Sequence, residues 1–178
     1  MLVIVLTGPE SSGKTTLSRQ LASHFDAPLV AEFVREFFKK KQTPQYVASD
    51  LLDIAIGQVA AENRAIAEYP NHPIIICDTD LLTLKIWSEE VFGRCDDWIS
   101  EQVTSSHPLT ELRFYLLCSP ENVAWEADPL RENPHDRDRL FDIYLKNLIF
   151  LKKNHEILRG SKNERFAAAV EKISALLV

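Results

Sequence analysis

The sequence predicts an α/β fold with three layers, in which a five-stranded parallel sheet lies between helices on both of its faces. Two observations lead to this expectation. Short apolar runs recur along the chain at 2–6, 74–77 and 112–118, as expected for buried strands. Longer segments with apolar residues at three- and four-residue spacing separate these runs, and parallel strands require such helical crossovers.

The elements are expected in a regular order along a single domain, residues 1–178. Pro70 ends a long helix, Ser119 and Pro120 form a turn, and Gly160 precedes the last helix. The expected strand order is 2-3-1-4-5, and residues 121–139 are expected to form a lid. Strands are predicted at 2–6, 28–31, 74–77, 112–118 and 156–158, and helices at 14–25, 32–41, 45–69, 81–92, 96–105, 139–154 and 164–177.

The composition excludes several classes of protein. The 178 residues carry a formal net charge of −6 and a pI near 5.4, so long-range attraction to nucleic acid is not expected. No segment approaches the roughly 18 uninterrupted apolar residues of a membrane-spanning helix. The three cysteines form no Cys-x-x-Cys pair, and the five histidines show no zinc-ligand spacing. A cytoplasmic protein with reduced cysteines is therefore expected, and its oligomeric state is open.

One stretch carries a specific chemical signal. Residues 8–15 read Gly-Pro-Glu-Ser-Ser-Gly-Lys-Thr, which matches the Walker A pattern and lies between an expected strand and an expected helix. Gly8 and Gly13 allow the turn and the close approach that direct backbone amides at phosphate groups. A chance glycine-rich turn is the alternative, and the flanking strand and helix disfavour it.

The side chains of this loop have distinct expected roles toward ATP and Mg²⁺. Lys14 is expected to reach the β- and γ-phosphates, Thr15 to ligate Mg²⁺, and Thr16 to donate to the α-phosphate. The residues expected to bind the nucleotide are Gly8, Glu10, Ser11, Ser12, Gly13, Lys14, Thr15 and Thr16, together with Arg137 from the lid.

The third expected strand ends in acidic residues. A carboxylate at Asp78 can hold Mg²⁺ opposite Thr15. Asp80 has two interpretations, since it can bind substrate hydroxyls or cap the helix that follows it. The helices after it, which contain Trp87 and Trp98, are interpreted as scaffold with both indoles in the core.

Charged residues after the second strand and in the lid are the remaining candidates. Glu32 and Arg35 follow the strand at 28–31, where ligands of open α/β sheets bind; a solvated helix start is the alternative. A lid needs guanidinium groups that face the transferred phosphoryl. Arg131 is the first candidate for this role, and Arg137 and Arg139 are the others.

Four segments of the chain form a combined pattern: the loop at 8–15, Glu-Phe-Val-Arg-Glu-Phe at 32–37, Asp-Thr-Asp at 78–80 and Trp-Glu-Ala-Asp-Pro-Leu-Arg at 125–131. On these segments the chain resembles, nearly end to end, the ribosylnicotinamide kinase domain of the NadR family of P-loop kinases. The resemblance implies transfer of the ATP γ-phosphoryl to the 5′-hydroxyl of nicotinamide riboside, which gives nicotinamide mononucleotide in NAD salvage.

The resemblance also implies roles for single residues. Asp78 would hold Mg²⁺, and Trp125 would stack on the cationic nicotinamide ring. Three carboxylates are candidates to accept the hydroxyl proton: Glu32, Asp78 and Asp80. Pro129 stands where the family has glycine, and its fixed φ can alter the lid or the choice of substrate. The ribose and its 5′-hydroxyl would be lined by Glu32, Arg35, Asp80 and Asp128.

Other functions are open at this point. Another nucleoside or small-molecule kinase fits the same motifs, and a regulatory NTP-binding ATPase is the alternative from a different class. The chain lacks the Asn-Lys-x-Asp motif of GTP switches, and Thr79 follows Asp78 where motor ATPases usually carry glutamate. It also lacks the nucleotidyltransferase motif of longer family members. The kinase step alone is therefore expected.

Overall fold

β1 (Leu2–Thr7) is the central strand of a parallel sheet in the computed structural model, which describes residues 1–105, 112–127 and 135–178. The strand order is β2-β3-β1-β4-β5, and every neighbouring pair is parallel. The predicted five-stranded sheet and its order are confirmed. The other strands are β2 (Leu29–Val30), β3 (Ile74–Asp78), β4 (Arg113–Cys118) and β5 (His155–Leu158).

Both faces of β1 are buried, which explains its uninterrupted apolar sequence. Val3 and Val5 belong to one core cluster, while Ile4 and Leu6 belong to the other. All four side chains are at most 3% exposed. Since successive side chains of a strand point to opposite faces, a central strand of a three-layer fold needs an apolar residue at every position.

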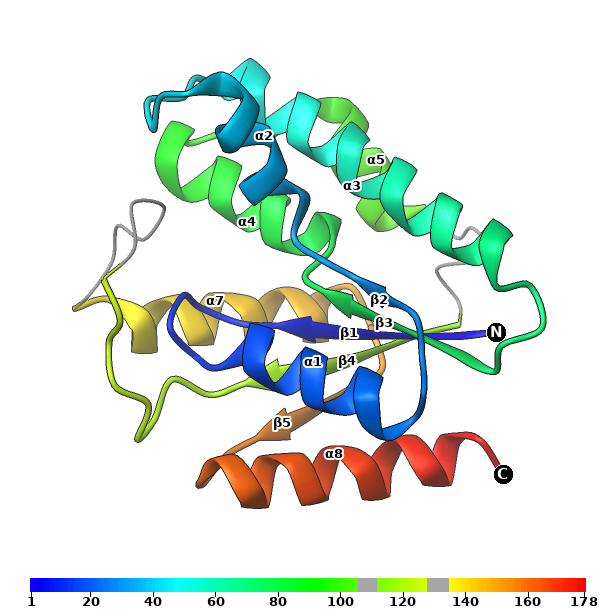
Figure 1. Cartoon of the computed structure of the whole chain (residues 1–178). Coiled ribbons are helices and arrows are strands. Elements are labelled where there is room, and N and C mark those ends of the chain that lie inside the picture. Colours follow the sequence, from blue (N-terminus) through cyan, green and yellow to red (C-terminus); the bar gives the residue numbers. More distant parts are fainter. Residues whose placement is uncertain (106–111, 128–134) are drawn as a thin grey trace.

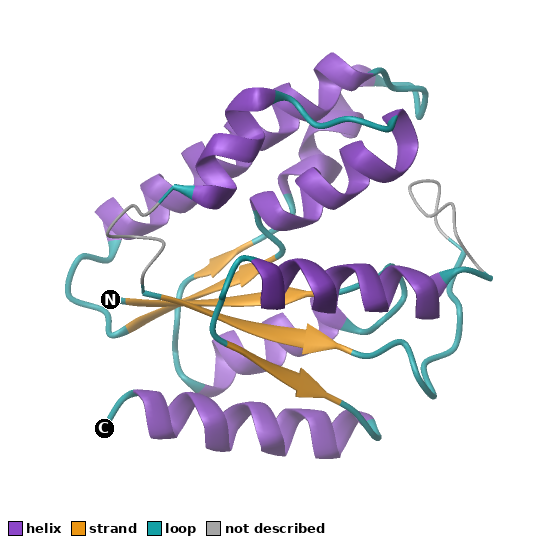
Figure 2. Ribbon diagram, turned by 180° about the vertical axis from the view of Figure 1, so that it is seen from behind, coloured by secondary structure: helices purple, strands orange, loops and turns teal. Residues whose placement is uncertain are grey.

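Helices cover the two faces unequally (Figures 1 and 2). One face packs against α1 (Lys14–His24) and α8 (Lys162–Leu176). The larger layer on the other face contains α2 (Phe33–Lys41), α3 (Ala48–Glu68), α4 (Leu81–Phe92), α5 (Asp97–Thr104) and α7 (Arg137–Phe150).

The described helices include none with the length and apolar character needed to cross a bilayer.

Several predicted boundaries are corrected by local hydrogen bonds. α8 begins at Lys162 instead of 164, because the Ser161 side chain accepts from the Glu164 amide while the Glu164 carboxylate accepts from the Ser161 amide. α3 begins at Ala48 instead of 45, where the Asp50 carboxylate accepts from the Val47 amide at 2.8 Å. Capping contacts therefore move the predicted boundaries.

α7 shows the largest difference from its predicted range, 139–154. It runs from Arg137 to Phe150, so that Arg137, which was expected in the lid at 121–139, lies in the first turn of this helix. It ends where the Lys152 backbone adopts a φ of 52°. Of the expected lid, residues 121–127 form no helix or strand. Residues 128–134, which include Asp128, Pro129 and Arg131, lie outside the described residues.

The close packing of α2 on α3 depends on a glycine in a helix interior. A Cβ added at Gly57 would lie 2.0 Å from Cε1 of Phe33. The Phe33 amide also donates to Oε1 of Gln58 at 2.9 Å. These two contacts hold the first residue of α2, and they thereby place Glu32, which directly precedes it.

We expect Gly57→Ala to lower the melting temperature, even though alanine favours a helix by about 1 kcal/mol over glycine. The added methyl group overpacks against Phe33, and overpacking costs about 1–3 kcal/mol. Thermal unfolding followed by circular dichroism measures the change. The double variant Gly57→Ala, Phe33→Leu is the control, because the smaller side chain restores room; a melting temperature that rises in Gly57→Ala alone would contradict the packing argument.

Candidate active site

The loop between β1 and α1 has the backbone that phosphate binding requires. Gly8 has a φ of +131° and Gly13 a φ of +86°, and Gly13 directly precedes the first residue of α1. A Cβ at Gly8 would lie 2.7 Å from the carbonyl oxygen of Cys118 in the neighbouring strand. The two glycines therefore allow the chain to leave the sheet and start a helix whose first amides face outward.

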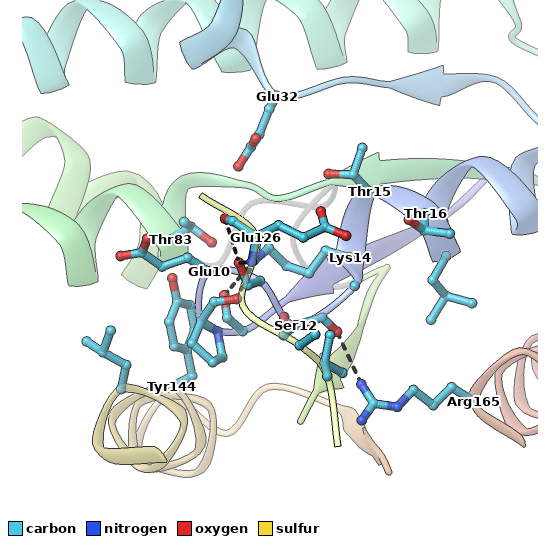
Figure 3. Close-up of a pocket in the computed structure, with 18 of the residues that line it drawn as sticks. Glu10, Ser12, Lys14, Thr15, Thr16, Glu32, Thr83, Glu126, Tyr144 and Arg165 are labelled. Carbon is cyan, nitrogen blue, oxygen red and sulfur yellow. Dashed lines mark hydrogen bonds between the residues drawn. The ribbon is translucent and has the colours of Figure 1, made fainter. Parts of the chain in front are cut away.

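Lys14 lies across the loop that it belongs to. Its Nζ donates to the carbonyl oxygens of Gly8 at 2.9 Å and Pro9 at 2.7 Å. Thr15 and Thr16 follow in the first turn of α1, and all three side chains line one cavity (Figure 3). The ammonium group and both hydroxyls are thus available at a single surface.

That cavity has a volume of about 860 Å³, which is within the range of sites that hold small molecules. Its walls come from segments far apart in the chain: the phosphate loop, the start of α2, one face of α4, residues 122–124 and 126, the first turns of α7, and the loop before α8. The phosphate loop and the acidic Glu32 therefore belong to one continuous space.

Charge is distributed unevenly along this cavity. The end at the phosphate loop carries four basic side chains: Lys14, Arg19, Lys162 and Arg165. The other end is lined by Glu32 and Glu90, each with an arginine beside it: Arg35 Nε lies 3.6 Å from Glu32, and Arg139 Nη2 lies 2.6 Å from Glu90. In Figure 3, Glu32 points into the space from the start of α2. A polyanion fits the basic end better than the other end.

Asp78 ends β3 beside the strand that precedes the phosphate loop, with Leu6 as its register partner. Its side chain is 3% exposed, and within the described part of the chain its Oδ1 has no hydrogen-bond partner. A buried carboxylate oxygen without a partner is costly unless a cation satisfies it. Asp78 is not among the residues that line the cavity, and the described residues contain no cluster of three metal-ligating side chains.

Asp80 lies apart from this site. Its Oδ1 accepts from the Leu82 amide at 3.0 Å, and its Oδ2 accepts from the Tyr115 hydroxyl at 2.7 Å. Arg113 lies 3.6 Å from the same carboxylate and also pairs with Glu62. These groups face a separate cavity of about 140 Å³. The helix-capping alternative describes these contacts, and the substrate role of Asp80 stays a prediction.

Burial controls the electrostatics of this second group. Burial raises the pKa of the Glu62 carboxyl above its ordinary value, although the positive charge of Arg113 opposes the shift. Burial also raises the pKa of the Tyr115 phenol, and the nearby Asp80 carboxylate adds to it. Tyr115 thus remains a neutral hydroxyl that donates to Asp80.

Among the described residues of the expected lid, Arg137 contacts Trp125 and the phosphate loop, and Arg139 lines the cavity. Arg137 Nη1 donates to the carbonyl oxygens of Ser11 at 3.0 Å and Val123 at 2.9 Å, and its guanidinium lies 5.9 Å from the ring centre of Trp125. Neither Arg137 nor Trp125 lines the cavity, whereas Arg139 does. Arg137 therefore supports the phosphate loop here, and its role toward ATP stays a prediction, as does the stacking role of Trp125.

Residues 3–165 match a family described as "AAA domain". The chain belongs to this AAA domain family. The chain is 28% identical over 184 residues to the trifunctional NAD biosynthesis/regulator protein NadR of Salmonella typhimurium (strain LT2) and 28% identical over 181 residues to that of Escherichia coli (strain K12). Each alignment covers 98% of this chain and 42% of the relative, so the chain spans about two fifths of those proteins. The resemblance to NadR is confirmed.

Solved structures show the same fold. The structure of NadR protein in complex with NR gives a TM-score of 0.72 at 19% identity, and it covers 98% of this chain and 51% of that one. The structure of NadR protein in complex with NAD and AMP-PNP gives a TM-score of 0.71 at 19% identity, and the match covers 98% of this chain and 49% of that one. The structure of deoxyadenosine kinase from M. mycoides with bound dATP gives a TM-score of 0.59 at 12% identity, and the match covers 98% of this chain and 100% of that one. The predicted three-layer α/β fold of P-loop kinases is confirmed.

Arg165 is a residue of this AAA domain chain that sequence reasoning missed. Its guanidinium donates to the carbonyl oxygen of Ser12 at 3.1 Å (Figure 3). The guanidinium also donates to the carbonyl oxygens of Ser119 at 2.6 Å and Glu121 at 2.7 Å, and its Nε donates to that of Gly160 at 2.7 Å. One buried cation therefore joins the phosphate loop to the loops after β4 and β5. Its position on the buried face of α8, in line with Ala169 and Ile173, was a signal in the sequence.

Arg165→Met is expected to weaken ATP binding about tenfold or more and to lower the melting temperature, because it leaves buried carbonyl oxygens without donors at about 1–3 kcal/mol each. Calorimetry measures the ATP affinity, and thermal unfolding measures the stability. Lys162→Met is the matched control, since Lys162 lies on the same helix and cavity but is exposed. Equal effects of the two substitutions would show that Arg165 acts only through its charge.

Proposed function

We propose that this chain is an ATP-dependent kinase that phosphorylates the 5′-hydroxyl of nicotinamide riboside and so forms nicotinamide mononucleotide. The observation that carries the proposal is the continuous cavity, which joins the phosphate loop with Lys14 to the Glu32 carboxylate at the start of α2. Such a cavity has room for a nucleoside triphosphate and a nucleoside together. The relationship to NadR, which has been solved with NR and with AMP-PNP, supports this choice of acceptor.

The donor half of the reaction uses the phosphate loop. Backbone amides at the start of α1 bind the phosphates, and Lys14 exchanges its two loop carbonyls for phosphate oxygens. In the proposal, Thr15 and Asp78 hold Mg²⁺, which neutralises charge on the phosphate oxygens. The unpartnered Oδ1 of Asp78 supports this assignment, since oxygen ligands suit the ion.

The acceptor half uses the other end of the cavity. The 5′-hydroxyl oxygen attacks the γ-phosphorus, the bond from that phosphorus to the bridging oxygen of ADP breaks, and the hydroxyl proton passes to a carboxylate. Glu32 and Asp78 are the candidates for this base, and Glu32 already lines the cavity. Arg35, Asp80, Asp128 and the lid residue Arg131 keep the roles implied by the resemblance as proposals, and Trp125 is one of two candidates for contact with the ring.

A purified-protein assay with ATP, Mg²⁺ and a panel of nucleosides tests the function. We expect nicotinamide riboside to be phosphorylated with a higher kcat/KM than any purine or pyrimidine nucleoside, and mass spectrometry identifies the product. Preference for another nucleoside would overturn the acceptor but keep the kinase. Slow ATP hydrolysis without any phosphorylated acceptor would favour the regulatory ATPase instead.

Lys14→Ala and Asp78→Ala are expected to lower kcat by about a hundredfold or more, since removing one group that stabilises transition-state charge typically costs 10²–10³. Steady-state kinetics at saturating ATP measure the loss. Lys40→Ala and Asp53→Ala are matched controls, because both side chains are exposed and distant in sequence from the loop. A kcat within threefold of the unmodified chain in either site variant would contradict its assigned role.

A further inference from the structure

One face of α4 forms a wall of the cavity, although the sequence pattern indicated a scaffold helix. Thr83, Ile86, Trp87 and Glu90 recur at three- and four-residue spacing, and all four line the cavity. Tyr144 of α7 lines it as well. In Figure 3, Thr83 and Tyr144 lie at the opposite end of the site from Thr15 and Thr16. This wall is therefore away from the expected position of the triphosphate.

Trp87 is held in a defined orientation within this wall. Its indole nitrogen donates to the hydroxyl of Tyr46 at 2.9 Å, and the two rings meet edge to face with centroids 5.0 Å apart. The polar atom of the indole is thus satisfied on the side away from the cavity. The ring packs partly on the core and still lines the cavity, so an aromatic surface is available at low entropic cost.

Carboxylates lie near this aromatic wall, although Arg35 and Arg139 lie beside two of them, Glu32 and Glu90. Glu10, Glu32 and Glu90 line the same cavity. Burial raises the pKa of the Tyr144 phenol, a hydrogen bond with Thr83 opposes this shift, and the charges of Glu32, Asp80 and Glu10 add to it. The field of these carboxylates therefore reaches the wall. A cation that lies against an aromatic face and near carboxylates is stabilised by both.

The other candidate, Trp125, lacks these features. The guanidinium of Arg137 already lies over its ring at 5.9 Å, and Trp125 does not line the cavity. We propose that Trp87, within the wall of Thr83, Ile86 and Tyr144, binds the heterocycle of the acceptor and gives the site a preference for a positively charged aromatic ring. This inference rests on the proposed kinase function and assigns the specificity to a residue outside the motifs.

Equilibrium binding tests the inference separately from turnover. Calorimetry with the full chain, Mg²⁺ and a non-hydrolysable ATP analogue gives the Kd of nicotinamide riboside and of its uncharged 1,4-dihydro form. We expect Trp87→Leu to raise the Kd of the cationic acceptor roughly 2- to 30-fold more than the Kd of the neutral one, which is the range for a lost cation–π contact. Trp87→Phe is expected to give a smaller change of the same sign, because phenylalanine keeps a ring face.

Trp98→Leu is the matched control, because Trp98 packs against the same core cluster and does not line the cavity. It is expected to leave the ratio of the two Kd values unchanged. The inference is overturned if Trp87→Leu weakens both acceptors equally, or if the ratio changes in Trp125→Leu instead. If the unmodified chain binds the cation selectively but does not phosphorylate it, the proposed function fails and the assignment of Trp87 stands.

Discussion

The phosphate loop depends on one steric constraint, which is that the chain must turn away from β1 while it still lies against β4. Only glycine meets this constraint at position 8, where φ is +131° and a Cβ would lie 2.7 Å from the carbonyl oxygen of Cys118. The turn made there allows α1 to begin directly after Gly13 and Lys14 to reach across the loop. The direction of the helix amides, and so the donor half of the site, follows from that contact.

A second cation stabilises this geometry without being free to bind a ligand. The guanidinium of Arg165 holds three loops together, so its hydrogen-bond donors are engaged in the fold. Lys14 instead contacts carbonyl oxygens of its own loop beside the cavity. The positive charge of Arg165 nevertheless remains at the basic end of the cavity. This arrangement explains how a chain with a net charge of −6 can present a local site for a polyanion.

The acidic end of the cavity and the buried group around Asp80 serve different purposes. Glu32 and Glu90 line the space where an acceptor would lie. Asp80 instead caps α4 and accepts from Tyr115, which holds the helix that carries Thr83 and Trp87. Asp78 and Asp80, which are separated by one residue, thus have different environments. Asp78 ends β3 beside the strand that leads into the phosphate loop, whereas Asp80 lies at the start of α4.

The sequence by itself determined the strands, the phosphate loop and the family resemblance, because these signals are local: uninterrupted apolar runs, helical spacing and short motifs. Only the tertiary structure decided which distant side chains meet. The contact of Asp80 with Tyr115 spans 35 residues, that of Arg137 with Ser11 spans 126, and that of Arg165 with Ser12 spans 153. No local pattern encodes such contacts, since they depend on how helices pack on the sheet. For the same reason, the sequence pattern predicted Trp87 as a core residue, whereas in the fold it also lines the cavity.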